Sequence, residues 1–421
     1  MKLFSSLSKG GFLFVLLCIS CQRPKKEEVK VPKAIFIIVD GIPADVIEKL
    51  NPPVLGEISK AGGFTRAYVG GGKGMYSETP TISAVGYNSL LTGTWANKHN
   101  VWDNNIAAPN YHYWNLFRLA KENNSNLKTA IFSTWEDNRT KLVGEGIKQA
   151  GNIVLDYKFD GLEKDTIGFP HISGSNFMQR IDEAVSDEAA RVISKDAPDL
   201  SWVYLEYTDD MAHQFGDSPQ FYEAVVAADR QIGKVWQAIK DREKKFNEDW
   251  LMVITTDHGR DAETGHNHGG QSDRERATWI VTNAPQRNEH FKQHPGIVDI
   301  FPSICNHLKL PIQDDVFREI DGVPFIGPID IAELAGNKKG DKISLTWKNF
   351  SENGDDNAEI WVSETNNFKE GGHDAYQKVG EVSLQMQRFE FEPKGASAFL
   401  KIVVKTSHQF ANVWITSNKT L

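Results

Sequence analysis

Continuous apolar runs alternate with amphipathic stretches along the first three quarters of the chain. The runs over 34–39 and 251–255 carry no charged residue, which is typical of strands buried on both faces of a parallel sheet. Strands are expected over residues 34–39, 128–133, 202–206, 251–255 and 277–282, and helices over 44–60, 83–92, 112–123, 219–242 and 296–307. This alternation predicts an α/β fold in which helices cover both faces of a mostly parallel sheet.

The pattern changes at residues 327–340, which read as a boundary between domains. Beyond it, short alternating runs predict strands without intervening helices at 343–347, 359–362, 382–391, 399–404 and 411–415. Such a pattern is typical of a small antiparallel β-sandwich, here similar to a fibronectin type III domain. We therefore expect a large α/β domain over 33–333 and a β-sandwich over 340–421.

The N-terminal residues have the pattern of an export signal. Lys2 and Lys9 precede the apolar run 12–19, and Cys21 follows Ser20. This layout resembles a bacterial lipoprotein signal, which is cleaved before a cysteine that becomes acylated; a plain secretory signal is the alternative. We expect a signal region over 1–21, a polar tether over 22–32 and a lipid anchor at Cys21 in the periplasm or outer membrane.

Composition narrows the function classes. Of 421 residues, 40% are hydrophobic and 24% charged, as in ordinary globular proteins, and the net charge of −9 argues against binding to nucleic-acid polymers. Beyond residue 21 the only cysteine is Cys305, so a disulfide within that part of the chain is excluded. Cys305 lies in an apolar helical pattern and is expected to pack as a small hydrophobe.

Aspartates and histidines follow the predicted strands. The first strand leads into Asp40, the strand over 202–206 into the pair Asp209 and His213, and the strand over 251–255 into Asp257-His258. Two further histidines stand in Gly265-His266-Asn267-His268-Gly269. Because ligands bind beyond the carboxyl ends of parallel strands, and carboxylate with imidazole suits zinc, these residues predict a metal centre there.

Ser83 opens the predicted helix over 83–92. A hydroxyl at a helix N-terminus lies beside free backbone N–H groups and the positive end of the dipole, which suits a nucleophile attacking a phosphate. Serine is also a common helix N-cap, and this segment alone would favour that interpretation. The metal-ligand pattern favours the nucleophile.

Together these motifs resemble the alkaline phosphatase superfamily, and within it the type I phosphodiesterase/nucleotide pyrophosphatase branch, over about residues 33–330. The resemblance implies two divalent metal ions, most often zinc. The residues that it implies for the first are Asp40, Ser83, Asp257 and His258, and those for the second are Asp209, His213 and His268. His268 is preferred to His266 because His268-Gly269 matches the family's His-Gly step.

The segment from Thr92-Gly93 through His99 to Asn104 matches a further family motif, which implies that Asn104 donates to a phosphoryl oxygen. Arg139, after the strand over 128–133, is a candidate second phosphate ligand; the alternative is a surface arginine paired with Glu136 or Asp137.

One departure from the branch concerns substrate specificity. The branch usually has Thr-Phe-Pro-Asn-His where this chain has Ser83-Ala84-Val85-Gly86-Tyr87. The segment of this chain also lacks the Pro and Arg that a sulfatase has around its nucleophile, which argues against a sulfatase. Gly70-Gly71-Gly72-Lys73-Gly74 has no Ser or Thr after its lysine, so it is not a P-loop.

The resemblance implies hydrolysis of a small phosphoric ester through a phospho-serine, with a preference for diesters or nucleotide pyrophosphates. A phosphomonoesterase, a phosphoglycerol or phosphoethanolamine transferase, and a surface-binding lipoprotein without catalysis are the alternatives. The last is disfavoured because all six Asp and His ligands accompany a hydroxyl nucleophile.

Overall fold

The computed structural model describes residues 29–172, 176–351, 353, 356–393 and 398–416. The expected signal region, Cys21 and most of the expected tether lie outside these residues. The first strand begins at Val31, so the last two positions of the segment expected as a tether belong to the sheet instead. Pro32 fits there because the start of a strand tolerates a missing N–H donor.

A seven-stranded sheet forms the centre of the larger part, in the order β2-β7-β6-β1-β5-β3-β4. The central strand β1 pairs in parallel with β5 and β6, and β7 is antiparallel to β6 and β2. Its strands are β1 (Val31–Val39), β2 (Gly63–Tyr68), β3 (Thr129–Ser133), β4 (Tyr157–Phe159), β5 (Leu200–Leu205), β6 (Glu248–Thr255) and β7 (Ala277–Thr282). The mostly parallel α/β sheet predicted from the sequence is confirmed.

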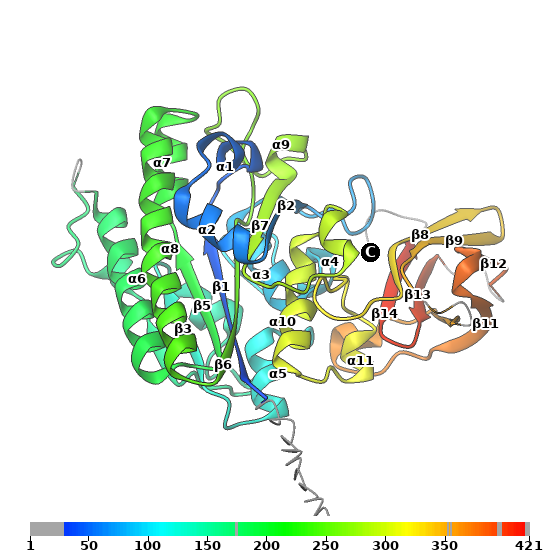
Figure 1. The fold of residues 1–421 in the computed structure, drawn as a ribbon. Coiled ribbons are helices and arrows are strands. Elements are labelled where there is room, and N and C mark those ends of the chain that lie inside the picture. Colours follow the sequence, from blue (N-terminus) through cyan, green and yellow to red (C-terminus); the bar gives the residue numbers. More distant parts are fainter. Residues whose placement is uncertain (1–28, 173–175, 352, 354–355, 394–397, 417–421) are drawn as a thin grey trace, which may run out of the picture.

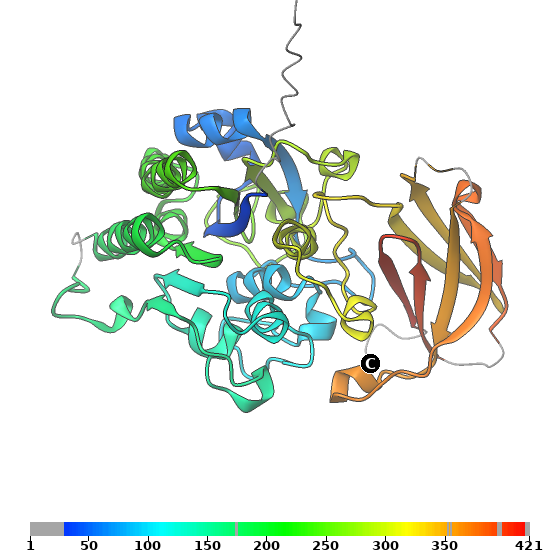
Figure 2. The ribbon, with the colours of Figure 1, turned by 60° about the horizontal axis from the view of Figure 1, so that its bottom comes forward.

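Helices cover both faces of this sheet (Figures 1 and 2). Phe36 and Ile38 of β1 pack with α3, α5 and α10 on one face, whereas Ile35 and Ile37 pack with α1, α2, α6 and α8 on the other. The α-helices are α1 (Ala44–Leu50), α2 (Pro53–Ala61), α3 (Ser83–Thr92), α4 (Ala96–His99), α5 (Leu116–Asn123), α6 (Phe177–Asp196), α7 (Tyr207–Phe215), α8 (Pro219–Lys245), α9 (Asp273–Arg276), α10 (Ile300–Leu308) and α11 (Asp314–Phe317).

The C-terminal strands form two antiparallel sheets, β11-β10-β13-β14 and β12-β9-β8. Buried residues of both sheets, including Leu345, Ile360 and Ile402, share one hydrophobic core. The strands are β8 (Ile331–Lys339), β9 (Lys342–Asn349), β10 (Asn357–Ser363), β11 (Gln377–Ser383), β12 (Arg388–Phe391), β13 (Phe399–Lys405) and β14 (Phe410–Thr416). They lie beside the larger part, as the orange and red ribbons of Figure 1 show.

Several elements differ from the sequence-based expectation. The single helix expected over 44–60 is two helices, because Asn51 adopts a left-handed conformation and two prolines follow it. The strand expected over 382–391 is interrupted by a 3₁₀ turn at Leu384–Met386. Strand β8 occupies most of the segment 327–340, where the sequence pattern predicted a domain boundary and did not predict a strand.

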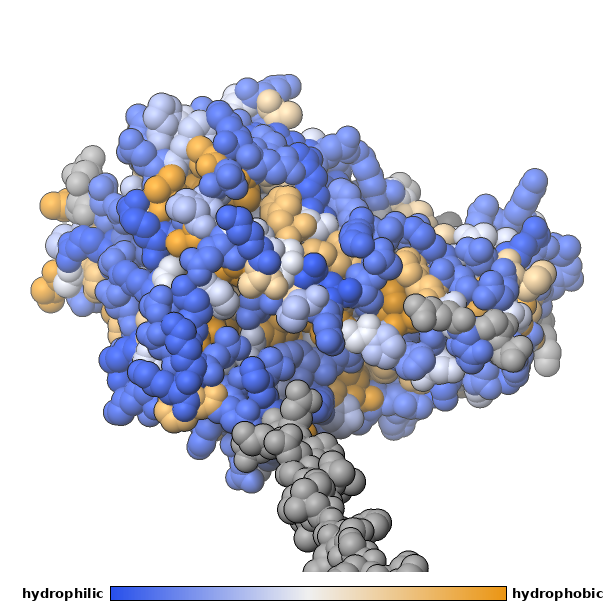
Figure 3. All heavy atoms as spheres, viewed as in Figure 1, coloured by the Kyte–Doolittle hydropathy of each residue, from blue (hydrophilic) through white to orange (hydrophobic). Residues whose placement is uncertain are grey.

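The face drawn in Figure 3 is largely hydrophilic, and its apolar side chains lie in scattered groups. Within the described ranges, every helix is too short or too polar to cross a lipid bilayer.

Candidate active site

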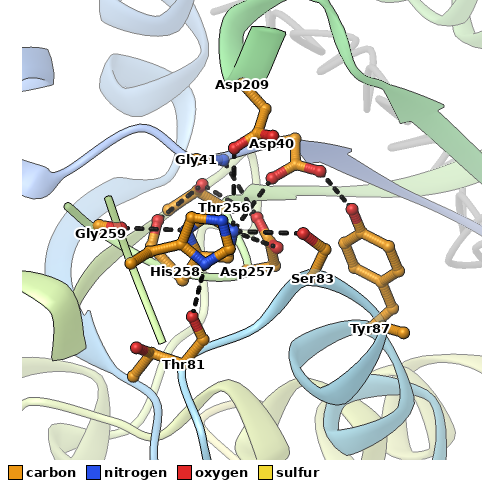
Figure 4. Close-up of polar contacts among 12 residues, drawn as sticks. Asp40, Gly41, Thr81, Ser83, Tyr87, Asp209, Thr256, Asp257, His258 and Gly259 are labelled. Carbon is orange, nitrogen blue, oxygen red and sulfur yellow. Dashed lines mark hydrogen bonds and ion pairs between the residues drawn. The ribbon is translucent and has the colours of Figure 1, made fainter. Parts of the chain in front are cut away.

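Ser83 is the first residue of α3, and its hydroxyl contacts a histidine rather than the helix backbone. Ile82 occupies the N-cap position in extended conformation. Ser83 Oγ lies 3.3 Å from His258 Nε2 (Figure 4). The helix-cap interpretation of Ser83 is therefore wrong, and the hydroxyl faces the group of aspartates and histidines.

Three buried residues form what we call the inner cluster: Asp40, Asp257 and His258. Asp40 follows β1 and Asp257 follows β6, the strand paired with it, so both carboxylates reach the same sheet edge. Asp40 Oδ1 and Asp257 Oδ2 each lie 3.3 Å from His258 Nε2. His258 Nδ1 lies 2.9 Å from the carbonyl of Gly259, a contact that directs Nε2 toward the carboxylates.

Gly86 allows α3 to approach the inner cluster. A Cβ atom at this position would lie 2.6 Å from the backbone oxygen of Asp257. A glycine is therefore required one turn after Ser83 for the helix to bring that hydroxyl against His258.

The outer cluster consists of Asp209, His213 and His268. Asp209 and His213 are one turn apart on α7, and His213 Nε2 lies 3.3 Å from Asp209 Oδ2. His213 Nε2 is also 3.1 Å from His268 Nε2, and His268 Nδ1 is held 2.9 Å from the carbonyl of Thr81. Two imidazole nitrogens that face each other in this way require a shared proton or cation between them.

His266 lies outside the outer cluster. Its Nδ1 is 2.9 Å from the backbone oxygen of His213, so it contacts the helix that carries a cluster residue. The structure thus brings His268 together with Asp209 and His213, in line with the choice made from the sequence.

Two tyrosines orient Asp40. The hydroxyls of Tyr87 and Tyr204 both donate to Asp40 Oδ2, the latter over 2.7 Å, and they contact each other at 2.8 Å. Asp40 Oδ1 is left facing His258. Tyr87 occupies the position of the histidine in the family motif Thr-Phe-Pro-Asn-His. The residue by which this chain departs from the motif therefore donates a hydrogen bond to Asp40 of the inner cluster.

Arg260 is a fully buried arginine that joins the loops carrying both clusters. It donates to the backbone oxygens of Gly41 at 3.1 Å, His266 at 3.1 Å and Asp209 at 3.2 Å, and it pairs with the carboxylate of Asp209. Gly41 has φ of +68°, and a Cβ there would lie 2.4 Å from Arg260 Nη2, so this contact also requires glycine.

The site is short of positive charge. Burial and the charge of Asp40 raise the pKa of Asp257 well above its usual range. Burial alone would lower the pKa of His258, but the carboxylates of Asp257 and Asp40 raise it to about 9. Burial opposes ionisation of Asp209, but the charge of Arg260 together with the contacts of His213 and His258 outweighs it, so the pKa of Asp209 is lowered. This environment favours an additional cation.

Two buried carboxylate oxygens, Asp40 Oδ1 and Asp257 Oδ2, have no hydrogen-bond partner in the described part of the chain. Burial of such an oxygen without a donor or a metal is costly. The donor set of each cluster, carboxylate with imidazole, is the one that zinc accepts. Both clusters therefore fit a divalent cation.

Asn104 lies beside Ser83. Its Oδ1 accepts from the backbone N–H of Ala84 over 3.0 Å, which places its amide next to the first turn of α3. The side chain is exposed, as is required of a group that contacts a substrate.

Arg139 is instead bound by carboxylates. It makes a bidentate pair with Asp160 at 2.7 and 2.8 Å, and it donates to Glu145 at 2.8 Å. Glu136 approaches at 3.5 Å. Among the residues that the structure describes, no hydrogen bond or ion pair links Arg139 to either cluster, so its phosphate-binding role finds no support in this arrangement.

Sequence reasoning missed the residues that support the clusters. Arg260 follows the Asp257-His258 pair closely, and Tyr87 lies one turn after Ser83, so both could have been found by asking what surrounds each ligand. Tyr204 gave no such signal, because a tyrosine within an apolar run resembles any other buried strand residue.

Zinc titration distinguishes the two histidines. His268→Ala should weaken binding at the outer cluster by on the order of 100-fold or more, because it removes a ligand, whereas His266→Ala should cost at most about 10-fold. Calorimetric titration of both variants measures this, and the reverse ranking would contradict the arrangement described.

Comparisons with known proteins agree on a family. The profile of "Type I phosphodiesterase / nucleotide pyrophosphatase" matches residues 34–274. Venom phosphodiesterase of Naja atra is 25% identical over 241 residues, which are 54% of this chain and 26% of that protein. This chain thus spans about a quarter of the length of that curated relative.

Solved structures bear on the fold alone. Phosphonate monoester hydrolase of Agrobacterium radiobacter superposes with a TM-score of 0.51 at 12% identity, covering 91% of this chain and 89% of that one. Human ectonucleotide pyrophosphatase / phosphodiesterase 5 gives 0.49 at 13% identity, covering 67% and 96%. Since the matched profile covers more than half of the sequence and includes both clusters and Ser83, the chain belongs to the type I phosphodiesterase / nucleotide pyrophosphatase family.

Proposed function

We propose that this protein is a metal-dependent phosphoric ester hydrolase that acts through a phospho-serine at Ser83. The observation that carries the proposal is the position of the Ser83 hydroxyl, 3.3 Å from His258 at the start of a helix and facing the inner cluster. Membership of the family supports hydrolysis of a small phosphoric ester.

Asp40, Asp257, His258 and Ser83 would hold one divalent cation, and Asp209, His213 and His268 the other, with zinc favoured by the donor set. When bound, the two cations would lower the pKa of the nucleophile and neutralise charge on the phosphoryl oxygens. The proposal of two sites rests on the two clusters and on the two buried carboxylate oxygens that accept no hydrogen bond in the described part of the chain.

The residues of the chain account for the remaining steps. Ser83 Oγ forms a bond to phosphorus as it loses its proton, and the bond to the leaving oxygen breaks as that oxygen takes up a proton. We expect the Asn104 amide nitrogen to bind a phosphoryl oxygen, since its Oδ1 already accepts from the Ala84 N–H at the start of α3 and holds the amide beside Ser83. A water oxygen then forms a bond to phosphorus, the bond between phosphorus and Ser83 Oγ breaks, and the phosphoryl product leaves as Oγ takes up a proton. Both transfers of the phosphoryl group depend mainly on positioning of the reacting groups and on stabilisation of the charge on the phosphoryl oxygens.

A diester or nucleotide pyrophosphate is the preferred substrate in this proposal. A monoester dianion carries an additional charge that monoesterases commonly match with a cationic side chain. Arg139 is engaged by Asp160 and Glu145, and Arg260 is buried against Asp209. Neither arginine offers a free guanidinium to the phosphate, which favours the diester.

The cell-envelope location is a further part of the proposal. It rests on the sequence pattern around Cys21, which predicts export and a lipid anchor. Radiolabelled palmitate incorporation in a bacterial host, compared between the wild type and Cys21→Ala, tests it.

Ser83→Ala should lower turnover of bis-p-nitrophenyl phosphate by about 1,000-fold or more, because the residue that forms the covalent intermediate is lost. Because Ser83 is buried and its hydroxyl contacts His258 but caps no helix, stability should change by only about 1 kcal/mol. Ser83→Thr, which keeps a hydroxyl, is the matched control and should retain activity. Turnover near the wild-type rate in Ser83→Ala would favour a binding protein or another mechanism.

Arg139→Ala should lower stability by about 3 kcal/mol, because the nearly buried carboxylate of Asp160 loses its bidentate partner, while Glu145 keeps its pair with Lys158. The ratio of p-nitrophenyl phosphate to bis-p-nitrophenyl phosphate turnover should stay unchanged. Arg191→Ala, which breaks an exposed pair with Glu188, is the control and should have little effect on stability. A selective loss of monoester turnover in Arg139→Ala would restore the phosphate-binding role.

A further inference from the structure

The loop over residues 99–110, which carries Asn104, is attached to the C-terminal part of the chain at both of its ends. We propose that the C-terminal part positions this loop, and with it the Asn104 amide, through Lys98 at one end and Asn110 at the other. The catalytic consequence rests on the role proposed above for Asn104.

Lys98, immediately before the loop, is held by a buried polar network. Its side chain is 1% exposed. Its Nζ donates to Asp321 Oδ1 at 2.6 Å, to the backbone oxygen of Glu319 at 2.7 Å and to Asn412 Oδ1 on β14 at 2.8 Å. The three N–H groups of the Lys98 ammonium thus each have an acceptor, so the hydrogen-bonding capacity of this buried cation is used in full. One of these acceptors belongs to the C-terminal sheets.

Neighbouring contacts make this attachment specific. Asn412 Nδ2 donates to the backbone oxygen of Ile320 at 2.6 Å, so the same side chain contacts both sides of the junction. Trp414 of β14 lies under the ammonium groups of Lys98 and Lys401, with 4.8 and 4.7 Å to the ring centroid. A buried charge of this kind costs free energy in any other alignment, so the network specifies one relative position of loop and sheet.

Asn110 fastens the other end of the loop. Its backbone N–H donates to the oxygen of His99 at 2.9 Å and closes the loop, and its Nδ2 donates to the oxygen of Lys369 at 2.9 Å. Lys369 belongs to the 3₁₀ helix Asn367–Glu370, which lies between β10 and β11. The loop is therefore attached to two separate elements of the C-terminal part.

The loop also contacts the helix that carries the nucleophile. His99 is fully buried, and its Nε2 lies 3.1 Å from Ser89 Oγ on α3. Asn104 Oδ1 accepts from Ala84 N–H at 3.0 Å on the same helix. The side chains that flank Asn104, those of Trp102, Asp103 and Asn105, are exposed, whereas Val101 and Ile106 are buried in the core that α3 shares. Asn104 thus lies in an exposed turn between two buried residues, and the contacts of Lys98 and Asn110 fix the ends of the segment that carries it.

Hydrogen exchange of the full-length protein tests the attachment without reference to activity. Asn412→Ala should accelerate exchange of amides within 99–110 by about 10-fold or more, because one fastening of the loop is lost. Asn110→Ala, which removes the contact with Lys369, should do the same. Asn357→Ala, on an exposed part of β10, is the matched control and should leave these amides unchanged. Unchanged exchange in both Asn412→Ala and Asn110→Ala would overturn the proposal.

A double-mutant cycle tests the catalytic consequence. Asn412→Ala should lower kcat by about 10-fold in the wild type but by less than about 2-fold in an Asn104→Ala background, since both changes act on one group. Asn412→Asp, which keeps an acceptor for Lys98, should recover part of the loss. Equal losses in both backgrounds would show that the sheets do not act through Asn104. If Asn104→Ala alone left kcat unchanged while exchange still accelerated, the role of Asn104 would fail and the attachment would stand.

Discussion

Mutual repulsion among three carboxylates is the constraint on which the arrangement of this protein depends. Asp40, Asp209 and Asp257 converge at one sheet edge because β1, β5 and β6 are parallel neighbours that end together. Arg260 places a positive charge against Asp209, and the carboxylates of Asp257 and Asp40 raise the pKa of His258. Positive charge in addition to Arg260 and His258 would reduce the remaining repulsion among the carboxylates, and two bound divalent cations would provide it.

The surrounding structure holds these charges in position against that repulsion. Tyr87 and Tyr204 fix one oxygen of Asp40 and leave the other toward His258. Thr81 holds His268 through its backbone oxygen, only two residues before Ser83. The positions of Ser83 and His268 are thus coupled through one short segment. The C-terminal sheets extend this support outward, because they contact the segment that carries Asn104.

The parts of this account that the sequence could predict are those encoded by local pattern. Apolar runs located β1 and β6, and the residues directly after them, Asp40 and Asp257, follow from the rule for parallel sheets. Helix α3 was predicted with the boundaries observed, because Ser83 and Gly93 bracket its apolar residues. Helix α6 was missed, although its buried positions recur with helical spacing from Ile181 to Ile193.

Contacts between distant segments could not be predicted in the same way. Arg139 stood after a strand, as the metal ligands did, but Asp160 and Glu145 approach it only in the folded chain. The attachment of Lys98 to Asn412 joins residues separated by more than 300 positions. Ser83 illustrates the limit in part: its own segment favours a helix cap, the metal-ligand pattern elsewhere in the sequence favours a nucleophile, and its contact with His258 could be found only in the folded chain.

The central claim is that two cation sites flank Ser83, and anomalous diffraction from crystals grown with zinc tests it most directly. The account predicts two peaks, one within about 2.3 Å of ligand atoms from Asp40, Asp257 and His258, and one at the same distance from Asp209, His213 and His268. A single peak, or peaks bound by other residues while both clusters remain without metal, would contradict it.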